Sequence, residues 1–372
     1  MKKLIAILLP LVFMGCAGVI RVPEPDVQTV PWPVPRGDCM NWASAGRDEG
    51  GLVELWRIKL KVPIIATPVA GDGAVFIGTG TRRVIAVNAN TGKRIGKMWT
   101  DVAVEDGMAY SDGRLVIGGR SIYNKLRCYD VFRSEFVWTK KSDRAASAPV
   151  VCGGRVFYST AKGALFALEL ETGERIWRKE LKDAVIEHEP AFRDSLLFVV
   201  DQNGMFYCID ADSGDEVWSL KVPTSASGPP VVIPDHVILP THSGRILVIT
   251  LDGRVRVEID APGELIAPIS CGGPTVFGVT RRGVAFAGDL GEGGILWQSN
   301  IEEPSLCGTV IWGTDIVTIG ASGRISLIDY GNGEITSQIE TKAFITAGPI
   351  IYDSKLFVAT SEGELIAIGR KN

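Results

Sequence analysis

The residues that carry most enzyme chemistry are sparse in this chain of 372 residues, which has seven cysteines and three histidines. His188, His236 and His242 lack the spacing to one another, or to a cysteine, that a zinc site requires. No two cysteines are adjacent, and there is no Cys-x-x-Cys-His sequence for haem attachment. Gly78-Thr79-Gly80 lies in a strand-like hairpin and not before a helix, so it lacks the context of a dinucleotide loop. These patterns predict no catalytic residue, no metal site and no cofactor.

Cys16 is the one cysteine with a chemical context that the sequence reveals. Two lysines precede an apolar run over residues 4–14, which is too short to span a bilayer core of about 30 Å. A basic start followed by a short apolar stretch indicates a secretory signal. Gly15 before Cys16 resembles the lipobox of bacterial lipoproteins, in which the cysteine thiol takes a diacylglycerol. We predict a signal peptide over residues 1–15 and lipidation at Cys16; the alternative is an ordinary signal peptide with a chance cysteine.

The cell compartment follows from the same resemblance. Ala17 follows the cysteine, where an aspartate would signal retention in the inner membrane. The resemblance therefore implies an anchor in the outer membrane, facing the periplasm. Residues 16–50 contain five closely spaced prolines, which fix the backbone and remove hydrogen-bond donors. We expect a lipidated, extended tether over this range.

The elements beyond residue 50 repeat about every 40 residues. A proline opens a strand in most units, a glycine marks a hairpin at intervals of 39 to 41 residues, and a tryptophan recurs. The tryptophans are Trp56, Trp138, Trp177, Trp218 and Trp297, while Gly96, Arg256 and Ser337 hold that place in the other units. Each unit contains four short runs rich in β-branched and aromatic residues, separated by glycine turns. Units of this size and content, in series, are typical of a β-propeller.

The predicted fold is therefore all-β: an eight-bladed β-propeller of four-stranded antiparallel blades over residues 51–372. The last unit lacks a fourth run, whereas Leu52–Leu60 has the pattern of a fourth strand with no blade of its own. We predict that this N-terminal strand pairs with the run Leu365–Ile368 and closes the ring. Closure would hide edge strands that otherwise invite aggregation.

The turn that precedes the tryptophan carries a specific motif. Residues 167–177 read Ala-x-Glu-x-x-Thr-Gly-Glu-x-x-Trp, and residues 208–218 repeat it with Cys, Asp, Ser and Asp at the variable places. This resembles the tryptophan-docking motif of quinoprotein-type, PQQ-like propellers, and the resemblance covers residues 53–372. A lipoprotein that consists of a tether and one such propeller is similar to the BamB family of outer-membrane assembly lipoproteins.

That resemblance implies a monomeric scaffold for the assembly of β-barrel outer-membrane proteins. Its partner would be the barrel-forming subunit of the assembly machine, bound through the loops between blades 3 and 4 and between blades 4 and 5. In this sequence those loops are residues 182–189 and 222–228. Val185 and Ile186 form an apolar pair that we expect to be exposed in the first loop, and His188 and Glu189 follow them. We take these four as candidate partner-binding residues.

The cysteines inside the propeller read as small buried residues. Cys128 and Cys208 share one repeat position, and Cys152 and Cys271 share another. Equivalent positions in separated blades are too far apart for a disulfide, which needs Cα atoms within about 7 Å. We therefore expect no structural disulfide.

Composition narrows the function classes. The chain is 46% hydrophobic, which excludes a disordered chain, and its net charge of −4 comes without any basic run, which argues against a nucleic-acid partner. Two alternatives to the scaffold stay open. One is a small quinone-dependent oxidoreductase, although the adjacent cysteine pair that such enzymes carry is missing. The other is a propeller of the cell envelope that binds a ligand or polymer.

Overall fold

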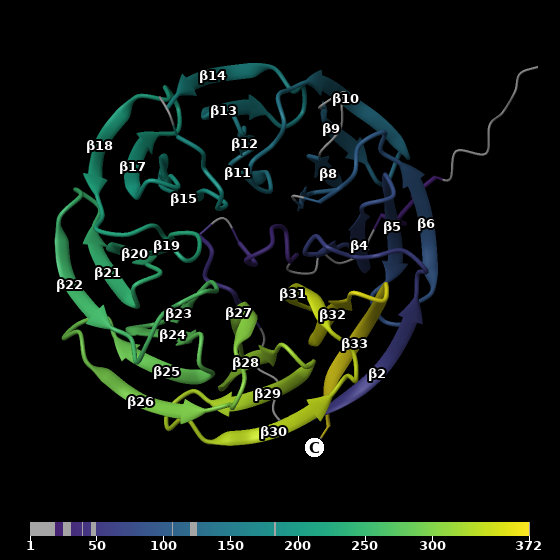
Figure 1. Cartoon of the computed structure of the whole chain (residues 1–372). Coiled ribbons are helices and arrows are strands. Elements are labelled where there is room, and N and C mark those ends of the chain that lie inside the picture. Colours follow the sequence, from purple (N-terminus) through teal and green to yellow (C-terminus); the bar gives the residue numbers. More distant parts are fainter. Residues whose placement is uncertain are drawn as a thin grey trace, which may run out of the picture.

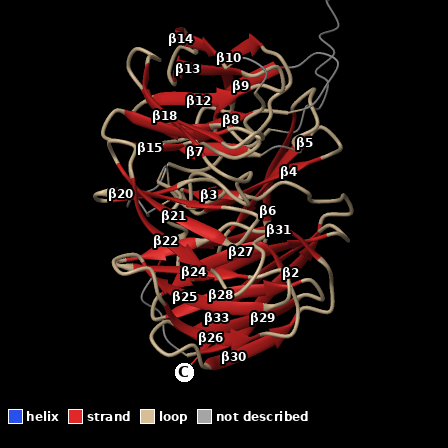
Figure 2. Cartoon of the chain, turned by 60° about the vertical axis from the view of Figure 1, so that its left-hand side comes forward, coloured by secondary structure: helices blue, strands red, loops and turns tan. Residues whose placement is uncertain are grey.

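The computed structural model describes residues 19–24, 31–38, 40–45, 50–105, 107–119, 125–181 and 184–371. Eight sheets stand around a common axis, as Figure 1 shows, and each sheet contains an antiparallel blade of four strands. Figure 2 shows the ring obliquely, with strands forming the body of the molecule and loops connecting them. The predicted eight-bladed propeller is confirmed. The described parts of the chain contain no helix that is long and apolar enough to cross a membrane.

The first four blades follow one another along the chain. The strands of each blade are given from the innermost to the outermost. Blade 1 holds β3 (Val69–Gly71), β4 (Ala74–Thr79), β5 (Arg83–Asn88) and β6 (Arg94–Trp99), and blade 2 holds β7 (Met108–Ser111), β8 (Arg114–Ile117), β9 (Lys125–Asp130) and β10 (Glu135–Lys141). Blade 3 holds β11 (Val150–Cys152), β12 (Arg155–Ser159), β13 (Ala164–Glu169) and β14 (Arg175–Glu180), and blade 4 holds β15 (Ala191–Arg193), β16 (Leu196–Val200), β17 (Met205–Asp210) and β18 (Glu216–Lys221).

Blades 5 to 7 continue the order, and blade 8 takes its outermost strand from the start of the ring. Blade 5 holds β19 (Val231–Ile233), β20 (His236–Pro240), β21 (Arg245–Thr250) and β22 (Val255–Asp260); blade 6 holds β23 (Ser270–Gly272), β24 (Thr275–Val279), β25 (Val284–Asp289) and β26 (Ile295–Asn300); blade 7 holds β27 (Ser305–Trp312), β28 (Asp315–Gly320), β29 (Arg324–Asp329) and β30 (Ile335–Glu340); and blade 8 holds β31 (Ile345–Tyr352), β32 (Lys355–Thr360), β33 (Glu364–Lys371) and β2 (Gly51–Lys59).

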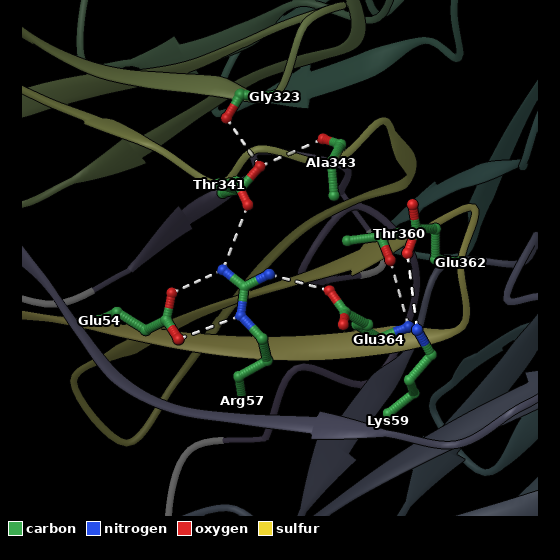
Figure 3. Close-up of polar contacts among 9 residues, drawn as sticks. All are labelled: Glu54, Arg57, Lys59, Gly323, Thr341, Ala343, Thr360, Glu362 and Glu364. Carbon is green, nitrogen blue, oxygen red and sulfur yellow. Dashed lines mark hydrogen bonds and ion pairs between the residues drawn. The ribbon is translucent and has the colours of Figure 1, made fainter.

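The ring closes as the sequence predicts. β2 pairs antiparallel with β33, so the N-terminal strand completes the blade that ends the chain. Figure 3 shows the polar contacts that secure this junction. The Arg57 guanidinium lies 2.7 Å from the Glu54 carboxylate and 2.8 Å from that of Glu364, and it donates a 3.2 Å hydrogen bond to the Thr341 carbonyl after blade 7. One side chain therefore joins both ends of the propeller and the neighbouring blade.

The tryptophans dock on the next blade. The indole nitrogens of Trp138, Trp177, Trp218 and Trp297 each donate a hydrogen bond of 2.7 to 3.0 Å to a backbone carbonyl in the following blade. The acceptors are Leu170, Ala211, Leu251 and Tyr330, which all directly follow the end of the third strand.

A glycine at the turn makes room for each docked ring. Gly173 has a φ of +64°, and a Cβ added there would lie 2.6 Å from the Trp138 ring. Gly214, Gly253, Gly333 and Gly92 stand in the same relation to Trp177, Trp218, Trp297 and Trp56. The Thr-Gly and Ser-Gly pairs of the motif are therefore needed both for the turn and for close packing between blades.

Part of the predicted tether lies inside the ring. Residues 31–38 and 40–45 lie at the centre of the propeller in Figure 1, and β1 (Ser44–Ala45) pairs with the inner strand β27 in parallel. Trp32 exchanges backbone hydrogen bonds of 2.8 and 3.0 Å with Ala70 of blade 1, and the Val232 amide of blade 5 donates to the Met40 carbonyl at 2.9 Å. The expectation of an extended tether over residues 16–50 is wrong for this part. Its backbone carbonyls, with the Trp32 amide, pair with inner strand edges that would otherwise face an open channel.

The cysteines depart from the prediction at one position. Cys128, Cys208, Cys271 and Cys307 are free, whereas Cys152 is disulfide-bonded. The prediction of no structural disulfide is therefore wrong, because it weighed only pairs between blades. Nor do Cys152 and Cys271 share a position: Cys152 pairs with Arg155, the first residue of β12, whereas Cys271 pairs with Val276, the second residue of β24.

Candidate functional site

The loop between β14 and β15 carries the candidate partner-binding residues, and its described part is Leu181 and residues 184–190. Val185 is half-buried, and its carbonyl accepts a 2.9 Å hydrogen bond from the Gln202 amide of the neighbouring hairpin. Glu187, two residues on, is exposed. This stretch therefore offers one apolar and one acidic side chain to a partner.

Ile186 does not belong to that surface. It is 1% exposed and packs between blades 3 and 4 in a cluster that includes Phe157, Leu165 and Leu197. Its carbonyl accepts a 3.1 Å hydrogen bond from the Ser159 hydroxyl. The expectation of an exposed Val185–Ile186 pair is wrong for Ile186, since the loop turns this side chain back into the interface between the blades.

A repeat signal could have revealed this burial. The position of the recurring proline is held by Pro68, Met108, Pro149, Pro190, Pro229, Pro268, Thr309 and Pro349. The residue three or four places before it is buried in all eight blades; in chain order these residues are Ile64, Val104, Ala145, Ile186, Ala226, Leu265, Ser305 and Ile345. The buried residue precedes that position by three residues in blades 5 and 6 and by four residues in the other blades. A search of the sequence at one fixed spacing therefore misses the pattern.

His188 links the two loops that the sequence resemblance singles out. Its Nε2 lies 3.3 Å from the carbonyl oxygen of Ala226, in the loop between blades 4 and 5. Burial lowers the pKa of His188 below the usual histidine range, against the opposing effect of nearby Glu189. The imidazole is thus held neutral and serves as a bridge between loops.

Glu189 faces the channel. It lines a cavity of about 190 Å³ at the channel mouth together with Arg36, Cys307 and several threonines and prolines. Arg36 comes from the N-terminal segment and is 5% exposed; it donates to the carbonyls of Ile269 and Thr309 at 2.5 and 3.1 Å. Burial lowers the pKa of Arg36 to about 10, and the charge of Glu189 partly counteracts that shift. Arg36 is not among the residues predicted from the sequence, although two tryptophans nearby, Trp32 and Trp42, are unusual in a free tether.

Cys307 contributes a thiol to the lining of this cavity. Burial raises the pKa of the Cys307 thiol in the cavity to about 11, so that thiol is protonated at neutral pH and is a weak nucleophile. The described residues contain no group of three or more His, Cys, Asp or Glu that could hold a metal ion. The channel itself, the concave centre of the propeller, is occupied by residues 31–38 and 40–45.

The sequence is similar to a known family over most of its length. The family model described as "Outer membrane protein assembly factor BamB" matches residues 82–186 and 162–372. The BamB of Salmonella typhimurium is 25% identical over 375 residues, covering 95% of this chain and 80% of that protein. The BamB of Yersinia pestis is 23% identical over 238 residues, and there the match spans only 58% of either chain.

Solved structures share the fold. BamB from Moraxella catarrhalis superposes with a TM-score of 0.72 at 19% identity, covering 86% of this chain and 98% of that one. A quinohemoprotein alcohol dehydrogenase from Comamonas testosteroni gives a TM-score of 0.75 at 15% identity, covering 93% of this chain and 82% of the enzyme. The propeller fold is thus common to an assembly factor and an enzyme, and fold alone does not choose between them.

Proposed function

Because the chain belongs to the family of the outer membrane protein assembly factor BamB, we propose that it is a non-enzymatic scaffold in the assembly of β-barrel outer-membrane proteins. The filled channel is the observation that carries this choice over an oxidoreductase. Residues 31–38 and 40–45 hydrogen-bond to inner strands of blades 1, 2, 5, 6 and 7, so the molecule offers surfaces to a partner and keeps little room for a cofactor. The name of the relatives as assembly factors supports the same choice.

We place the protein at the periplasmic face of the outer membrane, attached through a lipid on Cys16. The family to which it belongs acts in outer-membrane assembly, and the Gly15-Cys16 junction supplies the lipidation signal. Its partner is the barrel-forming subunit of the assembly machine.

The proposed contact surface consists of the two neighbouring loops, residues 184–189 and 222–228. The His188–Ala226 contact holds them together, and their most accessible side chains are Glu187, Pro223 and Thr224, with half-buried Val185 beside them. Ile186 and His188 support this surface from below, and Glu189 lies toward the channel.

A pull-down from solubilised envelopes tests the surface. Val185→Asp places a carboxylate at the contact and should abolish recovery of the barrel subunit, because its charge must be desolvated on binding. Arg144→Asp is the matched control, since the Arg144 carbonyl makes the same contact one blade earlier, accepting from the Ala161 amide. Full recovery with a folded Val185→Asp protein contradicts the surface, and no recovery with the wild type contradicts the function.

A further inference from the structure

The outer edge between blades 1 and 2 lacks the docked indole found at five of the other seven blade interfaces. Gly96 holds the tryptophan position of β6, so there is no side chain to dock on blade 2. The carbonyl that such an indole would reach is that of Val131, which directly follows β9 as Leu170 and Ala211 follow the third strands of blades 3 and 4. The fold therefore leaves both a slot and a hydrogen-bond acceptor at this edge.

Residues 19–22 fill the slot. The Val22 amide donates a 2.9 Å hydrogen bond to the Val131 carbonyl, in place of the missing indole. Ile20 is fully buried in the cluster of blades 1 and 2, and its carbonyl accepts a 2.9 Å hydrogen bond from the Tyr129 hydroxyl. A Cβ on Gly96 would lie 2.2 Å from the Val19 carbonyl oxygen, so only glycine permits this docking. Figure 1 shows the segment at the perimeter beside β6.

We propose that this docking sets the orientation of the propeller on the membrane, with the edge of blades 1 and 2 against a phospholipid surface that contains anionic headgroups. The inference rests on the lipid attachment proposed at Cys16. Three peptide steps separate Cys16 from Val19, and an extended chain covers at most about 3.6 Å per residue. The lipid is therefore attached within about 11 Å of the docked edge.

The charge distribution fits the same orientation. Residues 69–141 carry twelve Lys and Arg against seven Asp and Glu, whereas the rest of the chain carries 27 against 36. On the perimeter beside the docked segment, five basic side chains form no ion pair with any described residue, and we call them the basic rim: Lys93, Arg94, Lys97, Lys140 and Lys141. Across the ring, the perimeter strand β26 has no charged residue and β30 has one, Glu340. An anionic surface therefore attracts one side of the ring selectively.

Two exposed aromatic side chains accompany the basic rim. Trp99 at the end of β6 is 48% exposed, and Phe136 on β10 is 38% exposed. The Arg83 guanidinium carbon lies 4.4 Å from the centre of the Trp99 ring, and that of Arg127 lies 4.7 Å from the Phe136 ring. Trp is enriched at the headgroup level of bilayers, and Phe occurs on the apolar side of segments that lie in the interface, so both side chains suit contact with a lipid surface.

Depth-dependent fluorescence quenching tests the orientation. The lipidated full chain is placed on vesicles of phosphatidylethanolamine and phosphatidylglycerol that contain a headgroup-nitroxide lipid. A fluorophore is attached at Thr139→Cys on β10 or at Gln298→Cys on β26, which both directly follow the tryptophan position. The chain without an introduced cysteine measures labelling of native thiols. We expect severalfold stronger quenching at position 139; equal or reversed quenching overturns the orientation.

Gly96→Trp tests whether the docked segment is the cause. The new indole should occupy the slot, expel residues 19–22 and leave the propeller folded, with Arg21 newly open to trypsin. The difference in quenching between positions 139 and 298 should then fall; an unchanged difference with the segment expelled overturns the causal role. Ile20→Asp serves the same purpose if the first variant does not fold.

A wild-type chain that is neither labelled by palmitate nor retained on vesicles contradicts the anchor at Cys16, whereas equal quenching on bound protein contradicts the orientation alone.

Discussion

Arg57 and Glu364 lie 307 positions apart in the sequence, yet their charged groups are 2.8 Å apart where β2 meets β33. Beside this pair, the Trp56 ring lies within about 3 Å of the position a Cβ would take on Gly92 of blade 1. The same short strand therefore completes blade 8 and packs it against blade 1, so the whole ring depends on it.

Trp56→Ala tests this dependence. Removing a packed aromatic side chain typically costs about 3–5 kcal/mol. We expect a large drop in the thermal midpoint, measured by circular dichroism. Trp99→Ala is the control, because Trp99 is 48% exposed, and it should melt close to the wild type. A Trp56→Ala protein that melts like the wild type would mean that the ring is held closed elsewhere.

Gly173→Ala tests the glycine beneath the docked ring. Both Gly173 and Gly154 have positive φ, but an added Cβ meets the Trp138 ring at 2.6 Å only at Gly173, with nothing within 4 Å at Gly154. Backbone strain should cost each alanine variant about 1–3 kcal/mol. Overpacking should add about 1–3 kcal/mol at Gly173 alone. Urea unfolding measures both, and equal losses would contradict the packing role.

His188 should make the fold sensitive to acid. Burial depresses its pKa in the folded protein, while the unfolded chain titrates near 6.5. Below about pH 6.5 the unfolded state therefore binds more protons at this site, and stability falls as the pH falls. His188→Gln should reduce the loss of stability between pH 8 and pH 5.5, as measured by urea midpoints. An identical pH dependence in the variant would show that His188 is not the group responsible.

Reduction should destabilise the protein through Cys152. A native disulfide typically contributes about 2–4 kcal/mol. Dithiothreitol should lower the thermal midpoint of the wild type and should have no such effect on Cys152→Ala. Cys271→Ala is the control, because Cys271 is a free buried thiol, and it should respond to the reductant as the wild type does. A reductant-insensitive wild type would contradict a structural role for this bond.

Cys16→Ser should prevent lipid attachment. The variant lacks the thiol that would take the diacylglycerol, so palmitate labelling should disappear and the signal segment should remain uncleaved by the lipoprotein peptidase. Metabolic labelling followed by gel analysis checks both. Equal labelling of the variant and the wild type would place the lipid elsewhere or show that none is attached at this position.

The repeated part of the structure could be predicted because its determinants are local and recur. The tryptophan, the turn glycine and the acidic or polar cap appear at fixed spacing, and four runs per unit define a blade before any contact is known. The closing strand could also be predicted, since Leu52–Leu60 has the sequence pattern of a fourth strand but no blade of its own. Ile186 shows the limit of this approach, because a one-residue shift between blades hid the buried position it shares with Ala226 and Leu265.

The sequence by itself determined eight blades, their order and their closure, because each blade is encoded by its own 40 residues and needs only its neighbours. It also showed that Gly96 breaks the tryptophan pattern, but not what takes the place of the indole. Only the tertiary structure decided that Ile20 and Val22 fill that slot and that Arg36 lies in the channel. The N-terminal segments that contain these residues carry no repeated sequence pattern that would predict their position. Where they bind depends on cavities and unpaired carbonyls that exist only once the ring has formed.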